Sequence, residues 1–180
     1  MSNKLTGNKM GTQPIKKLIL TMGIPMIFSM IIQALYNIID SYFVSLIPGI
    51  ADQAMNALTL AFPIQMLIIA IGVGTGIGVN ALLSQNLGQG NSEQASRTAG
   101  NAVFLGICTY VVFLLFGIFG VNIYLSSQTA NAQILLLGKE YLTICVCLSF
   151  GSVLSMIYEK LLQSTGKTMH STIAQIAGAL

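Results

Sequence analysis

Five polar residues in the first apolar stretch of the chain could carry chemistry: Ser29, Gln33, Tyr36, Asn37 and Asp40. At about 100° per residue they fall on one side of a helix whose other side is aliphatic. Asp40 is the charged member of this polar stripe, and the sequence around it is apolar. A carboxylate inside a membrane is rare and costs about 2.5–3.5 kcal/mol on insertion scales, so it indicates a functional site. We therefore predict that Asp40 is a functional residue that binds a cation.

Two kinds of cation chemistry are open to this stripe. Burial disfavours the charged form of a carboxylate, which would let Asp40 take up and release a proton. Alternatively, the ionised carboxylate and the side-chain oxygens of Gln33 and Asn37 could hold sodium, a hard cation that prefers oxygen ligands. Tyr36 could stack on an aromatic cation. Structural roles are the alternatives. Asp40 could accept hydrogen bonds that hold the helices together, and Gln33, Tyr36 and Asn37 could make ordinary polar contacts between helices.

The composition points to an integral membrane protein. Hydrophobic residues make up 54% of the chain and charged residues 7%, whereas soluble domains carry about 25% charged residues. The net charge of +3 is too small and too scattered to favour nucleic acid as a partner. The first apolar run begins near Leu18 and is longer than a signal peptide's core, so we expect it to remain as a membrane helix.

The cysteines do not predict a disulfide framework or a metal site. Cys108, Cys145 and Cys147 lie in apolar runs and have no nearby His or Cys that would complete a ligand set. We expect no cofactor, with a proton or sodium as the coupling ion.

The apolar runs and their breakers predict an all-α, polytopic membrane bundle. Residues 1–14 should form a polar cytoplasmic tail, and residues 15–180 the transmembrane bundle. Pro25 removes one backbone hydrogen bond and should bend the first helix. The expected helices cover residues 15–46, 52–87, 93–119, 133–160 and 168–180, with 120–132 as a connection and the last helix cut off by the end of the sequence.

Four glycines at alternate positions of the second helix, Gly72, Gly74, Gly76 and Gly78, could suggest a nucleotide-binding loop. The spacing G-x-G-x-x-G is not met, however, and no strand precedes the run. Two interleaved G-x-x-x-G pairs instead predict close packing against neighbouring helices.

The basic residues predict the orientation of the chain. If the tail is cytoplasmic, Lys139 alone falls on the outer side, in agreement with the positive-inside rule. Asp40 then lies in the outer half of its helix, inside the bundle. We expect a multi-pass protein of the cytoplasmic membrane with a cytoplasmic N-terminus and lipid around it.

The sequence resembles the multidrug and toxic compound extrusion (MATE) family over nearly its whole length from Pro14. In that family a bend-forming proline precedes a Gln/Tyr/Asn-rich face that ends in an acidic residue, as Pro25 to Asp40 do here. The glycine-rich run GVGTGIGVNALLSQNLGQGN also matches. A Leu/Arg-rich segment before a Gly-x-Thr turn is matched loosely by KLLQSTGKT, where Lys160 stands in place of Arg.

The resemblance implies a carrier of twelve helices in two six-helix lobes, which exchanges inward-moving protons or sodium for outgoing, often cationic, organic compounds by alternating access. We then expect this chain to be the N-terminal lobe, with the C-terminal lobe as its partner. The family's acidic position in the fifth helix should fall just beyond Leu180.

Other classes remain as alternatives. A lipid-linked precursor flippase of the same broad superfamily should carry buried Arg or Lys for phosphate, and the sequence predicts none. A non-transporting membrane scaffold would not need a polar stripe with Asp40. An enzyme is disfavoured because no nucleophile set, His-rich motif or second intramembrane carboxylate is predicted.

Overall fold

The computed structural model describes residues 14–179, and every element in that range is helical. This confirms the all-α prediction. The expected polar tail lies outside the described residues, apart from Pro14. The elements are α2 (Ile15–Ser45), α3 (Ala51–Gly88), α4 (Ser92–Leu115), the π-helix η1 (Phe116–Gly120), α5 (Val121–Gln128), α6 (Ala132–Cys147), α7 (Phe150–Ser164) and α8 (Thr168–Ala179).

The third helix continues beyond its predicted end. Ser92–Gln128 forms one span from α4, η1 and α5, so the connection predicted over residues 120–132 is wrong for residues 121–128. Val121 and Leu125 are only 1% and 0% exposed. Their burial stabilises a helical segment that the local sequence alone, with several polar residues, does not strongly favour.

The fourth predicted helix, residues 133–160, is broken into α6 and α7. The two helices meet at a turn around Ser149 with a bend of 43°. The carbonyl groups at the turn have partners: the Tyr110 hydroxyl donates to the oxygen of Cys147 at 2.9 Å, and Ser149 Oγ donates to that of Val146 at 2.7 Å. The Val146 carbonyl also accepts from the Ser149 N–H at 3.2 Å. Because the Tyr110 hydroxyl supplies a donor at Cys147, the break leaves both carbonyls satisfied in an apolar setting.

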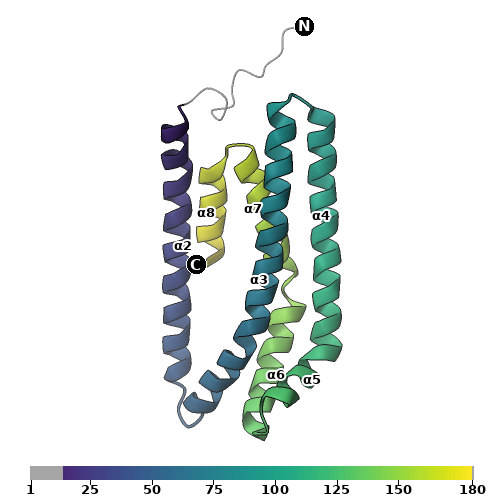
Figure 1. The fold of residues 1–180 in the computed structure, drawn as a ribbon. Coiled ribbons are helices and arrows are strands. Elements are labelled where there is room, and N and C mark those ends of the chain that lie inside the picture. Colours follow the sequence, from purple (N-terminus) through teal and green to yellow (C-terminus); the bar gives the residue numbers. More distant parts are fainter. Residues whose placement is uncertain (1–13, 180) are drawn as a thin grey trace.

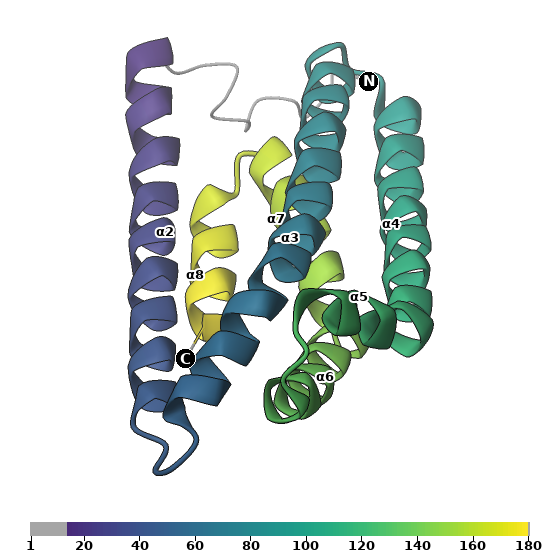
Figure 2. The same cartoon turned by 60° about the horizontal axis from the view of Figure 1, so that its bottom comes forward.

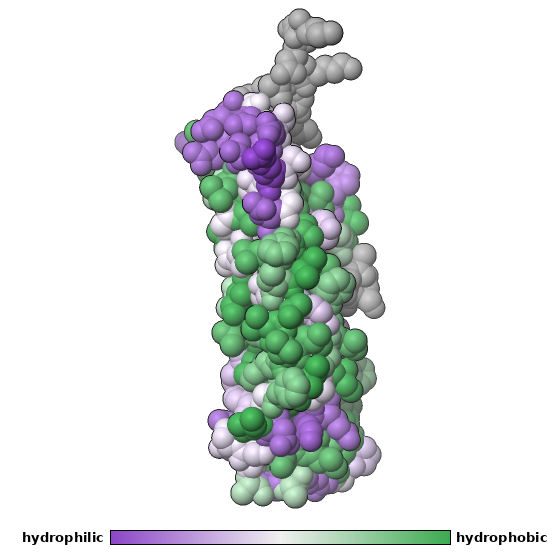
Figure 3. Space-filling view, turned by 90° about the vertical axis from the view of Figure 1, so that its right-hand side faces the viewer, coloured by the Kyte–Doolittle hydropathy of each residue, from purple (hydrophilic) through white to green (hydrophobic). Residues whose placement is uncertain are grey.

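Several helices of the described chain are long and apolar enough to cross a membrane. Three qualify alone, namely Ile15–Ser45, Ala51–Gly88 and Ser92–Gln128, and the bent pair α6–α7 would make a fourth. On the side that carries α4, a broad apolar band lies between more polar ends (Figure 3). These features indicate a multi-pass membrane protein.

Helix α3 is the centre of the bundle. It packs against α4, α6 and α7, and it crosses from the far end of α2 toward α4 (Figures 1 and 2). Helix α2 stands at the margin, packs mainly on α8 and has Ser29 as its buried residue. The apolar core therefore lies between the other helices, and consists of Ala61, Ile64, Ile68, Ala102, Phe113, Val121, Leu125, Leu142, Val146, Val153 and Ile157.

The glycine-rich part of α3 brings α7 close. Gly72 and Gly76 are buried. A Cβ atom added to Gly72 would lie 2.7 Å from Met156 Sδ, and one added to Gly76 would lie 2.6 Å from Lys160 Cγ. Helix α7 can approach this closely because the two positions have no side chain.

The expectation that Gly74 and Gly78 also pack against a neighbour is corrected by the structure. Both are exposed, and no heavy atom of the described residues lies within 4 Å of a Cβ added to either. Residues two apart in a helix point to opposite sides, because each step turns the chain by about 100°. Since Gly72 and Gly76 face α7, the other two glycines face away from it.

We expect Gly76→Ala to make the protein less stable than Gly78→Ala does. Both substitutions bring a similar gain in helix propensity, about 1 kcal/mol. Only Gly76→Ala pushes a methyl group into Lys160, and overpacking costs about 1–3 kcal/mol. Thermal unfolding of the purified protein in detergent measures the difference. Equal stability of the two variants would contradict this packing contact.

Candidate functional site

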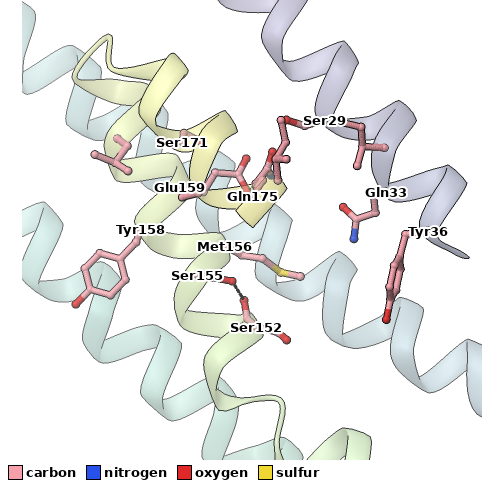
Figure 4. A pocket seen from close by; sticks show the side chains of 14 residues that line it. Ser29, Gln33, Tyr36, Ser152, Ser155, Met156, Tyr158, Glu159, Ser171 and Gln175 are labelled. Carbon is pink, nitrogen blue, oxygen red and sulfur yellow. Dashed lines mark hydrogen bonds between the residues drawn. The ribbon is translucent and has the colours of Figure 1, made fainter. Parts of the chain in front are cut away.

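Part of the polar stripe of α2 faces a cavity between α2, α7 and α8. Ser29, Gln33 and Tyr36 line it from α2, and its volume is about 560 Å³. These three side chains project from α2 toward the other two helices (Figure 4). The fold thus places this part of the stripe opposite polar groups from the end of the chain. The polar lining residues on α7 and α8 are Ser152, Ser155, Tyr158, Glu159, Ser171 and Gln175.

Asn37 and Asp40 lie farther along α2, away from this cavity. Asp40 follows Gln33 by seven residues (40 − 33), which is about 10 Å along a helix axis. Both Asn37 and Asp40 are exposed. Among the described residues no helix covers Asp40, because α8 covers only the part of α2 nearer the start of the chain (Figure 1).

A hydrogen bond joins polar side chains of the neighbouring helices α3 and α6. Gln65 of α3 donates from Nε2 to the Tyr141 hydroxyl oxygen at 3.0 Å. The charge of Asp40 acts on this tyrosine through space. Sequence reasoning missed the pair, because the two residues are 76 positions apart in the chain.

Pro25 lies inside α2 without breaking it. The helix is continuous from Ile15 to Ser45 and runs straight in Figure 1. The bend predicted at Pro25 is therefore not seen in this conformation of α2. Pro25 still lacks the N–H group that would bond to the preceding turn, so this part of the helix has one fewer hydrogen bond to break.

A network of hydrogen bonds surrounds the carboxylate of Glu159 on α7. Its Oε1 accepts from Lys160 Nζ at 3.0 Å and from Gln163 Nε2 at 2.7 Å, and its Oε2 accepts from Gln175 Nε2 of α8. Lys160 Nζ also donates to Gln163 Oε1 at 3.2 Å. Gln163 Nε2 lies 3.4 Å from the hydroxyl oxygen of Ser171. The network therefore connects the end of α7 to Ser171 and Gln175 of α8.

The ion pair in this network is largely buried. The side chains of Glu159 and Lys160 are 14% and 16% exposed, and Gln163 is 4% exposed. Exposed ion pairs contribute little to stability, whereas a buried carboxylate that loses its partner is strongly destabilising. For comparison, the Glu93–Arg97 pair on α4 has side chains that are 77% and 69% exposed.

Sequence reasoning missed the Glu159 network. The predicted helix ended at residue 160, which put Glu159 and Lys160 at the membrane surface, but α7 continues to Ser164. The expectation of no buried Lys is therefore wrong, and a second carboxylate is buried beside it. Lys160 is already paired, however, so it does not offer the free cation that a phosphate site would need. The sequence did contain a signal for the network: Glu159 and Gln163 are four residues apart in an apolar stretch, a spacing that brings two side chains together on a helix.

Ser29 faces the cavity with an unused hydrogen-bonding group. The residue is 7% exposed, and its hydroxyl has no hydrogen-bond partner among the described residues. Leaving a buried hydroxyl unpaired costs free energy. Such a group in a polar cavity is a candidate contact for a ligand.

We expect Ser29→Ala to leave the stability of the unliganded protein unchanged or to raise it. The substitution removes an unpaired hydroxyl, whereas Ser149→Ala, its control, removes a bond to the Val146 carbonyl and should cost about 1 kcal/mol. Thermal unfolding in detergent measures both variants. A Ser29→Ala protein that is destabilised as much as Ser149→Ala would show that the hydroxyl is satisfied within the fold.

The cysteines lie apart from this network. Cys108, Cys145 and Cys147 are free thiols, and among residues 14–179 no group of three His, Cys, Asp or Glu side chains is arranged to hold a metal ion.

Comparisons with known proteins place the chain among membrane transporters. Curated relatives include the FAD transporter of Shewanella oneidensis, 25% identical over 167 residues, and the multidrug export protein MepA of Staphylococcus aureus, 20% identical over 164 residues. The alignments cover 93% and 91% of this chain but 36% of each relative.

Solved structures of MATE transporters share the fold. A MATE protein in a straight conformation is 26% identical with a TM-score of 0.87, covering 99% of this chain and 39% of that one. A MATE protein in a bent conformation is 27% identical with a TM-score of 0.81, covering 91% and 36%. The chain thus spans little more than a third of these relatives, which corresponds to one lobe. The family model MatE matches residues 25–180, and the chain therefore belongs to the MatE family.

Proposed function

We propose that this chain forms one lobe of an exporter that exchanges protons or sodium ions for organic compounds by alternating access. The observation that carries the proposal is Asp40, a carboxylate on the polar stripe of an otherwise apolar, membrane-length helix. The relatives support it, because one is an FAD transporter and another is a multidrug export protein. The remainder of the carrier would be a second lobe that covers the exposed face of α2.

The location of Asp40 suits a coupling site. The charge of Asp40 acts on Tyr141 of α6, which is hydrogen-bonded to Gln65 of α3, so a proton or sodium ion bound at Asp40 would change the electrostatic field at these two helices as well as at α2. Binding of a cation neutralises the carboxylate and changes its hydrogen bonds. A ligand shifts a conformational equilibrium when it interacts differently with the two states.

Helix α2 is the element that we propose to move. It lies at the margin of the bundle, with Ser29 as its buried residue, and Pro25 removes one hydrogen bond near its middle. Few contacts therefore oppose a change in its shape. Related structures have been solved in straight and in bent conformations. In our proposal, cation binding at Asp40 biases α2 between two such shapes and so releases the substrate.

We further propose that the protein lies in the cytoplasmic membrane with its N-terminus in the cytoplasm. The basic residues support this orientation, because they gather on the side of the N-terminus, with Lys139 as the exception. The exported compounds would then leave the cell while the coupling ion enters it.

Transport in inverted membrane vesicles tests the proposal. Vesicles from cells that make the intact carrier, with both lobes, should accumulate a fluorescent organic cation when their lumen is more acidic, or richer in sodium, than the bath. Collapse of the effective gradient should release the dye. Accumulation that ignores both gradients, or that equals the accumulation in vesicles without the protein, would contradict the proposal.

A further inference from the structure

An apolar groove lies between α3 and α4, away from the polar cavity beside α2. None of the described residues lines both spaces. The volume of the groove is about 340 Å³. We propose that this α3–α4 groove holds an acyl chain of a membrane phospholipid.

The groove has a buried floor and an exposed rim. Ile64 of α3 and Phe113 of α4 form the floor, and these side chains are 9% and 6% exposed. Leu67 of α3 and Val112 of α4 form the rim, and they are 49% and 64% exposed. A hydrocarbon chain in the groove would therefore contact protein beneath it and on both sides, while its outer side stays open.

Two irregularities of the helices help to keep the groove open. Pro63, which lacks an N–H group, directly precedes Ile64 in α3, and Phe116 begins the π-helix η1 in the α4 span. Prolines and π-bulges are the usual causes of bends in long helices. The two helices lie side by side near Gly88 and separate toward their other ends (Figures 1 and 2). Their side chains therefore do not close the space at the level of the groove.

The depth of the groove restricts its ligand to the hydrocarbon part of a lipid. Ile64 lies 13 residues after the start of α3 (64 − 51), and Ile71 lies 17 residues before its end (88 − 71). Both ends of the helix are therefore about 20 Å or more away. Because the hydrocarbon core of a bilayer is about 30 Å thick, the groove lies in its inner part, where acyl chains are present and headgroups are not.

The groove and its surroundings have the chemistry of a lipid-facing surface. Among the described residues that line it, Thr109 is the only polar one and none is charged. The exposed face of α4 continues from Val112 to Leu115 and Phe119 and stays apolar, as the α4 side of Figure 3 shows. The exposed face of α2 differs, because it carries Asp40, which needs protein or water beside it. The second lobe therefore suits α2 as a cover, and lipid suits the groove.

Packing contacts, rather than release of water, would retain the acyl chain. Lipid tails are as apolar as the groove walls, so the transfer of a tail from the bilayer brings no hydrophobic gain. An empty groove, however, would leave Ile64 and Phe113 without contacts on one side, and a filled groove restores that dispersion attraction. Binding of the chain requires only that the helices span a membrane, so it does not depend on the proposed export.

Photolabelling of the intact carrier, with both lobes, tests the groove. The probe is a phosphatidylcholine with a diazirine in the middle of one acyl chain, present in trace amount in phosphatidylcholine liposomes. Peptide mapping by mass spectrometry should find the label on Phe113, although this side chain is only 6% exposed. A matched lipid with the diazirine beside the ester group should not label Phe113, because the groove lies deep in the hydrocarbon layer.

Two tryptophan substitutions separate the groove from the general lipid surface. Leu67→Trp fills the groove from its half-exposed rim and should reduce the mid-chain label on Phe113 to the level seen with the ester-proximal probe. Its matched control, Phe104→Trp, puts the same side chain on α4 at a position that is 68% exposed and outside the groove. The control should leave the label on Phe113 unchanged.

The other outcomes overturn the proposal. Wild-type protein without mid-chain label on Phe113 would have a groove that is empty or covered by a helix of the second lobe. Label that persists in Leu67→Trp, or that falls equally in Phe104→Trp, would show that the probe reaches Phe113 without occupying the groove. Gradient-driven export is measured separately in inverted vesicles, so failure of the lipid site and failure of the proposed function are distinguishable.

Discussion

In the intact carrier, Asp40→Asn is expected to abolish gradient-driven export, lowering it at least tenfold while the protein remains folded. Asparagine has nearly the shape of aspartate but can neither carry a charge nor exchange a proton, so both versions of the coupling chemistry are lost. The fold should tolerate the change, because Asp40 is exposed and no ion pair to it is seen among residues 14–179. Dye accumulation in inverted vesicles measures the effect.

The matched control for this variant is Asp52→Asn. Asp52 is also exposed and lies in the first turn of α3, where a carboxylate interacts favourably with the helix dipole and is worth about 0.3–1 kcal/mol. The Asp52→Asn variant should therefore keep most of the export activity. Equal, near-complete export by both variants would remove Asp40 from the mechanism and leave it as a structural polar residue.

Lys160→Met is expected to destabilise the protein by about 3–5 kcal/mol, the usual cost of removing one partner from a buried ion pair. The variant keeps the apolar stem that packs against Gly76 but leaves the Glu159 carboxylate, 14% exposed, without its cation. The two amide donors from Gln163 and Gln175 remain. They do not neutralise the charge. Thermal or chemical unfolding in detergent measures the loss.

A second substitution separates charge from packing. Glu159→Gln added to Lys160→Met removes the unpaired charge and should restore most of the lost stability, since a neutral pair in a buried site is often as stable as the ion pair. The exposed pair on α4 gives a control, because Arg97→Met breaks it and should cost less than about 1 kcal/mol. Similar losses for Lys160→Met and Arg97→Met would contradict the buried pair.

The parts of the fold that sequence reasoning predicted depend on local pattern. Long apolar runs bounded by Pro48–Gly49 and Gly88–Gly90 define α2 and α3, whose ends lie within one residue of the predicted ranges. The polar stripe was likewise visible, because helical spacing puts Ser29, Gln33 and Tyr36 on one face. The structure adds the surroundings of that face, because it shows that these residues line a cavity together with residues of α7 and α8.

The parts that sequence reasoning could not predict depend on contacts between distant segments. The Glu159 network needs Gln175, which is 16 residues away across a turn. The break between α6 and α7 is stabilised by Tyr110, which is 37 residues from Cys147. Neither partner follows from the local sequence.

The most direct test of the central claim is the release of the coupling ion when the substrate binds. Binding of tetraphenylphosphonium, which carries a fixed charge and no proton of its own, should release protons or sodium from the purified wild-type protein. A pH indicator or radioactive sodium detects the release. Linkage requires that a substrate which weakens ion binding also releases the ion. We predict release from wild type and from Asp52→Asn but none from Asp40→Asn, and undiminished release from Asp40→Asn would contradict the account.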